Sequence, residues 1–106
     1  MGVIEAILRR VWTGTFKVKE CTHLDTIQDV TPRSRVCNEC VALGDRWPDL
    51  RMCLVCGYVG CCDQAKNWHA MRHFEATGHP LFRPLGRGPL YRWLWCYVDQ
   101  ALLPLP

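Results

Sequence analysis

The sequence lacks long apolar runs and a clear secretory signal. It contains no stretch of roughly 18 apolar residues, so we expect no membrane-spanning helix. The N-terminal stretch MGVIEAILRRVW is interrupted by Glu5, Arg9 and Arg10, and a signal peptide needs an uninterrupted apolar core. These absences predict a cytoplasmic protein in a reducing compartment, where structural disulfides are rare.

The sequence also lacks a strong excess of charge of either sign. The 13 Lys and Arg residues exceed the 10 Asp and Glu residues by only three, giving a formal net charge of +3. This excess does not by itself argue for nucleic-acid binding. Nucleic acid remains an alternative partner that would be bound by Arg83, Arg87 and Arg92 beside nearby aromatic residues, although such an Arg-containing loop is more often simply solvated.

Cysteine and histidine are abundant and clustered. The chain has 8 Cys and 4 His residues, and the segment 53–79 holds four of the cysteines and three of the histidines. Thiol redox enzymes usually carry one C-x2-C motif in a thioredoxin-like setting, and a cysteine protease needs one distinguished Cys–His pair. Two C-x2-C pairs with histidines nearby instead favour metal binding.

The spacing of these residues is typical of zinc ligands. Two C-x2-C pairs can each direct both sulfurs at one ion: Cys37 with Cys40, and Cys53 with Cys56. His69 and His73 stand one helical turn apart, so their rings leave the same face of the predicted helix. His79 follows directly after Gly78, where that helix is predicted to end.

Further candidate ligands are Cys21, His23, Cys61 and Cys96, with Cys62 as an alternative to Cys61. Seven cysteines and four histidines make eleven ligands, whereas three tetrahedral ions need twelve. Asp99 stands where the second Cys of a C-x2-C pair starting at Cys96 would be. Because carboxylate oxygen also binds zinc, Asp99 is the candidate for the twelfth ligand.

The pattern predicts one small α+β domain, stabilised by zinc, with a short antiparallel sheet, one main helix and a short N-terminal helix. Residues 1–20 are predicted to be an amphipathic extension, residues 21–100 the zinc-binding domain, and residues 101–106 an apolar tail. The main helix is predicted to start after Asn67 as its N-cap. Strands are predicted on both sides of the second C-x2-C pair, after His79 and around the tryptophans near Cys96.

Five segments together resemble the UBP-type zinc finger, a module of ubiquitin-specific proteases and of a ubiquitin-binding histone deacetylase: CTHL, CNEC, CLVCGYVGCC, HAMRHFEATGHPL and WCYVDQ. The segments CVALGDRW, GCCD and WCYVD are most similar to the small stand-alone bacterial members. The resemblance covers residues 21–100 and implies three interleaved zinc sites. Their ligand sets would be Cys37, Cys40, Cys61 and His69; Cys53, Cys56, His73 and His79; and Cys21, His23, Cys96 and Asp99.

The resemblance also bears on ubiquitin recognition. Ubiquitin-binding members hold a free C-terminal Gly-Gly tail between aromatic residues, with an Arg after the third knuckle Cys receiving the carboxylate. Here Asp63 stands in place of that Arg and would repel a carboxylate. Trp95 and Tyr97 match the pocket aromatics, share one face of a predicted strand opposite Cys96, and are equally compatible with a place in the core. Another basic residue could restore anion binding: Arg46, Arg51, Arg72 or Arg92.

These observations predict a non-catalytic zinc-binding module that acts as an adaptor or accessory subunit of a larger assembly. The other protein would be held by the N-terminal apolar stripe, the C-terminal tail or the aromatic cluster, since aromatic residues are favoured at interfaces. The alternative function is a reader of free peptide C-termini with altered specificity. Catalysis is not expected, because closed zinc sites leave no position for an activated water.

Overall fold

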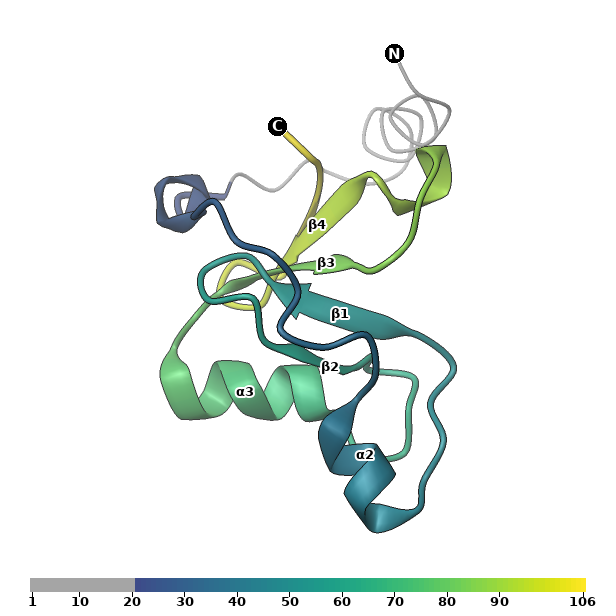
Figure 1. Cartoon of the computed structure of the whole chain (residues 1–106). Helices are drawn as coiled ribbons and strands as arrows, with labels where there is room; N and C mark the ends of the chain where they lie inside the picture. The colour runs from purple at the N-terminus through teal and green to yellow at the C-terminus, as the bar shows by residue number, and fades with distance from the viewer. Residues whose placement is uncertain (1–20) are drawn as a thin grey trace.

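A five-stranded antiparallel sheet forms the centre of this computed structural model, which describes residues 21–106 (Figure 1). The strands lie in the order β2-β1-β3-β4-β5. Their bounds are β1 (Leu50–Cys53), β2 (Val59–Cys61), β3 (Leu81–Pro84), β4 (Trp93–Cys96) and β5 (Ala101–Pro104). The helices are α2 (Asn38–Leu43), α3 (His69–Thr77) and the short 3-10 turns η1 (Leu24–Thr26) and η2 (Pro89–Tyr91). The expected small α+β fold with an antiparallel sheet is confirmed.

One face of the sheet carries the main apolar core. Alternation along β4 directs Leu94 and Cys96 to this face, and both side chains are fully buried. They pack in one cluster with Met52, Leu54, Val59, Leu81 and Ala101. The segment before α2 covers this face through Ile27 and Val30. The core is small, which leaves the fold dependent on additional links between its elements.

Helix α3 packs against the opposite face, over β2. Gly60 makes this approach possible, because a Cβ atom there would lie 2.8 Å from the backbone nitrogen of Ala70. Phe82 from β3 fills the adjoining space together with Cys53 and Ala70. Close contact between α3 and the sheet brings the histidines of the helix toward the cysteines of β1 and β2.

The start of α3 differs from the sequence prediction. The N-cap is Trp68, in a left-handed conformation with φ of 53°, and no side chain caps the helix. Asn67 was the expected cap, but its amide is bonded to another part of the fold. The predicted stop is confirmed, since Gly78 is the left-handed C-cap. Among residues 21–106, no helix is both long enough and apolar enough to cross a membrane.

The C-terminal boundary also differs. Residues 101–106 are predicted as a tail, but Ala101–Pro104 forms β5, the edge strand that pairs with β4. The apolar character of this segment is explained by Ala101 and Leu103, which pack on the main core. The domain therefore continues past residue 100. The predicted extension and short helix in residues 1–20 lie outside the described residues.

Candidate metal centres and an aromatic cleft

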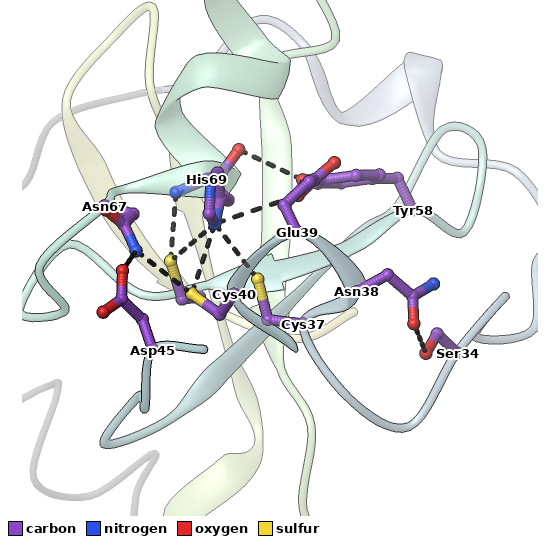
Figure 2. Close-up of polar contacts among 10 residues, drawn as sticks. Ser34, Cys37, Asn38, Glu39, Cys40, Asp45, Tyr58, Asn67 and His69 are labelled. Atoms are coloured by element: carbon purple, nitrogen blue, oxygen red, sulfur yellow. Dashed lines mark hydrogen bonds and ion pairs between the residues drawn. The ribbon is translucent and has the colours of Figure 1, made fainter. Parts of the chain in front are cut away.

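The first set of candidate ligands joins residues from three elements. Cys37 stands just before α2, Cys40 lies in α2, Cys61 ends β2 and His69 begins α3. All four are buried, and their ligand atoms lie within 4.8 Å of one another. His69 Nδ1 lies 3.1 Å from Cys37 Sγ and 3.4 Å from Cys40 Sγ (Figure 2). It also lies 3.4 Å from Cys61 Sγ.

These distances fit a tetrahedral zinc ion. Zinc binds sulfur at about 2.3 Å and nitrogen at about 2.0 Å, so a tetrahedral site separates the two atoms by about 3.5 Å. Three thiolates and one imidazole are a common donor set for structural zinc. The first set could therefore hold one ion with no open coordination position.

Polar contacts orient the first set. The Asn67 amide donates to Asp45 Oδ2 at 2.9 Å and lies 3.5 Å from Cys40 Sγ. Figure 2 shows the amide pointing toward both residues. The backbone N–H of His69 donates to Cys61 Sγ at 3.1 Å. Contacts of this kind fix the orientation of metal ligands and stabilise thiolate charge. Asn67 thus supports the metal site and does not cap α3.

The second set consists of Cys53, Cys56, His73 and His79, whose ligand atoms again lie within 4.8 Å of one another. Cys53 Sγ lies 3.5 Å from His79 Nδ1, and Cys56 Sγ lies 3.4 Å from His73 Nε2. Desolvation by burial is the main cause that lowers the pKa of His73, and this favours the neutral imidazole that binds metals. Two sulfurs and two nitrogens at these separations also fit tetrahedral zinc.

Tyr58 connects the first two sets and was not identified from the sequence. Its ring stacks on that of His73 with the centroids 4.1 Å apart. Its hydroxyl donates to the carboxylate of Glu39, which lies between the first two cysteines of the first set. Burial is the main cause that raises the pKa of Tyr58, so the hydroxyl stays protonated. A tyrosine near a knuckle has no distinctive spacing, so only its contacts in the fold reveal this role.

The third set brings the first described residues of the domain together with the turn before its last strand, β5. Cys21 and His23 precede η1, Cys96 ends β4, and Asp99 lies in the turn before β5. His23 Nδ1 lies 3.5 Å from Cys96 Sγ and 2.9 Å from Asp99 Oδ2. The backbone N–H of Thr22 donates to Asp99 Oδ2 and is the first cause of the lowered pKa of Asp99. The 2.9 Å distance is also that of a direct hydrogen bond, so His23 and Asp99 can be joined without a metal ion.

The structure thus brings together the same three sets that the resemblance implies. His69 and His73 leave one face of α3 but belong to different sets. Cys62 is buried beside Cys61, yet its sulfur belongs to none of the three. Burial raises the pKa of Cys61 to about 12 and the pKa of Cys53 to about 11. Bound zinc would reverse this preference, because a coordinated thiol is deprotonated.

An aromatic cleft of about 270 Å³ lies on the α3 side of the sheet. The lining residues are Arg51, Asp63, Gln64, Phe82, Trp93, Trp95, Tyr97 and Leu102. Trp95 lies in β4, whereas Tyr97 follows the end of that strand, but both line the cleft and both are half-buried. Tyr97 also stacks on Phe74 of α3 with the ring centroids 5.2 Å apart. The two aromatics are therefore walls of a cleft that is anchored on the core.

Two charged groups line this cleft. Asp63 Oδ1 accepts a hydrogen bond from the Tyr97 hydroxyl at 2.8 Å. The Arg51 guanidinium lies 4.9 Å from the ring centre of Trp93. Arg51 was one of four basic residues considered for anion binding, and it is the one that lines the cleft. Burial is the main cause that raises the pKa of Tyr97, so it remains a hydrogen-bond donor.

The arginines considered for nucleic-acid binding are differently arranged. The Arg83 guanidinium donates to the carbonyl oxygens of Pro84 and Tyr91, and so holds the loop between β3 and β4. Arg87 and Arg92 are exposed. Arg83 is therefore engaged in the fold, whereas Arg87 and Arg92 make no side-chain hydrogen bond or ion pair within residues 21–106.

Comparisons with known proteins agree with these observations. A family model described as the zinc finger in ubiquitin hydrolases and other proteins matches residues 37–104. BRAP2 RING ZnF UBP domain-containing protein 2 from Arabidopsis thaliana is 42% identical over 48 residues. That match covers 45% of this chain but only 9% of the plant protein.

A solved structure is similar over most of the chain. The solution NMR structure of protein RPA1320 from Rhodopseudomonas palustris is 45% identical, with a TM-score of 0.71. The match covers 81% of this chain and 82% of that one. The two chains therefore share a similar size as well as a fold.

Proposed function

Because this chain belongs to the family of zinc fingers found in ubiquitin hydrolases and other proteins, we propose that it is a non-catalytic module that uses zinc for stability and holds a partner protein in its aromatic cleft. The cleft is the observation that carries the proposal. Tryptophan and tyrosine side chains are enriched at binding hot spots, and both are half-buried here. The partner makes the chain an adaptor or accessory subunit of a larger assembly.

A structural role for zinc is supported by the ligand sets. Each set offers four ligand atoms, which fill a tetrahedral zinc ion and leave no position for an activated water. The three sets use seven of the eight cysteines. Thiols that bind metal are compatible with a reducing compartment, and we propose a cytoplasmic location on this ground.

We expect three zinc ions per chain, with the third dependent on Asp99. Native mass spectrometry of the purified protein should show three ions, and Asp99→Ala should show two because the third set loses its carboxylate ligand. Asp25→Ala, a change of the same charge in nearby η1, should keep three. Two ions in the unchanged protein would mean that His23 and Asp99 are joined by a hydrogen bond alone.

The cleft itself can be tested with two pools of random decapeptides. All peptides are N-acetylated, and the C-termini are amidated in one pool and free in the other. We expect the immobilised protein to select peptides, and Trp95→Ala to lower their affinity at least about thirtyfold, or about 2 kcal/mol, as at a hot spot. Trp68→Ala is the matched control, since Trp68 is 50% exposed and lies outside the cleft.

Both variants must retain the zinc content of the unchanged protein for the comparison to count. Selected peptides that bind equally well after Trp95→Ala would contradict the proposal.

A second candidate function is a reader of free peptide C-termini. The observation that favours it is Arg51, which brings a guanidinium into the cleft although the family's arginine position holds Asp63. Guanidinium groups pair well with carboxylates. This candidate requires that selected peptides come from the free-carboxylate pool and lose affinity on amidation and in Arg51→Gln.

A further inference from the structure

The carboxylate of Asp63 is the unmatched charge of the aromatic cleft. Asp63 is exposed, and its one side-chain hydrogen bond within residues 21–106 comes from Tyr97. No Lys or Arg of these residues lies within ion-pair distance of it. A neutral phenol donates to one carboxylate oxygen without neutralising the charge. The cleft therefore presents a negative group next to aromatic faces.

The positive group of the cleft is already paired. Arg51 Nη1 lies 3.1 Å from Asp49 Oδ2 and donates to the Leu50 carbonyl at 2.9 Å. The same guanidinium lies over the ring of Trp93. Asp63, in contrast, is bonded to Tyr97, so the two charged groups lie beside different aromatic residues of the cleft. A charged ligand that enters at Tyr97 meets the carboxylate first.

We propose that the cleft binds a lysine side chain of the partner protein, with the ammonium on Asp63 and the methylene stem against Trp95 and Tyr97. This inference rests on the proposed function and specifies its ligand. Aromatic faces attract cations, and a lysine stem packs well on apolar surface. Tyr97 occupies one oxygen of Asp63, which disfavours the two-point pairing that arginine prefers. A compact ammonium needs only the other oxygen.

The experiment continues from the amidated peptide pool. We expect selected peptides to contain a lysine, and its replacement by norleucine, which keeps four carbons but no charge, to lower affinity about tenfold. Asp63→Asn should cause a similar loss, because Asn still accepts the Tyr97 hydrogen bond but carries no charge. In Asp63→Asn the norleucine change should then have little further effect, since the two changes remove one interaction. Asp29→Asn, an equal charge change at an exposed site away from the cleft, should leave affinity unchanged.

The outcomes separate this inference from the proposed function. Peptides that are sensitive to Trp95→Ala but indifferent to the lysine change or to Asp63→Asn would overturn the lysine inference and leave the cleft as a binding site. Peptides insensitive to Trp95→Ala would overturn both. Binding confined to free C-termini and lost in Arg51→Gln would replace the lysine inference with C-terminus reading.

Discussion

Removal of zinc by a strong chelator is expected to unfold this protein. Structural zinc contributes about 10–16 kcal/mol in zinc-finger peptides, while a whole domain is usually stable by about 5–15 kcal/mol. Within the described residues, the buried core of the main face is a cluster of seven side chains. Such a core cannot replace the ions, so the metal-free chain should have no cooperative fold.

Circular dichroism and the dispersion of the amide NMR spectrum measure this loss, alongside metal analysis of the same sample. Added zinc should restore the folded spectrum, and magnesium should not, because thiolate ligands do not suit magnesium. A dispersed spectrum from a sample with no measurable zinc would show that apolar packing and hydrogen bonds suffice.

The second large effect is expected from one of two adjacent cysteines. Cys61 and Cys62 are both buried, with exposed fractions of 0% and 2%. Only Cys61 has its sulfur in a ligand set, 3.4 Å from His69 Nδ1. Cys61→Ser should therefore lose one zinc ion and lower the free energy of unfolding by more than about 4 kcal/mol, a size typical of a lost metal site. Cys62→Ser should keep every ion and cost about 1–2 kcal/mol, as an ordinary buried substitution.

Native mass spectrometry gives the ion count for both variants, and urea unfolding gives their stability. The pair is closely matched, because the same atom is changed at neighbouring buried positions. Loss of an ion in Cys62→Ser with full occupancy in Cys61→Ser would transfer the ligand role from one sulfur to the other.

Much of the metal chemistry could be expected from the sequence because ligand spacing is local. A C-x2-C pair fits one ion whatever surrounds it, and two histidines one turn apart share a helix face. The partition of His69 and His73 between two sets is not local, since it depends on how α3 packs over Gly60 of β2. Only the family resemblance indicated that partition in advance.

The features missed by sequence reasoning depend on contacts between distant residues. Asn67 has the side chain of a good helix cap, but Asp45 and the Cys40 sulfur compete for its amide and Trp68 takes the cap position. Residues 101–104 end in Pro104 and read as a tail, yet they pair along β4, where an edge strand tolerates proline. Tyr58 belongs to no sequence motif, so nothing in the sequence indicated its contacts with His73 and Glu39.

The third set has a consequence for the edge of the sheet. Its four residues join the first described residues of the domain to the turn before β5, and His23 Nδ1 lies only 2.9 Å from Asp99 Oδ2. Asp99 stands two residues before Ala101, so this link also holds the start of β5 against β4. Loss of the third set would therefore loosen β5 and uncover β4, and an uncovered strand edge invites pairing with other chains and aggregation.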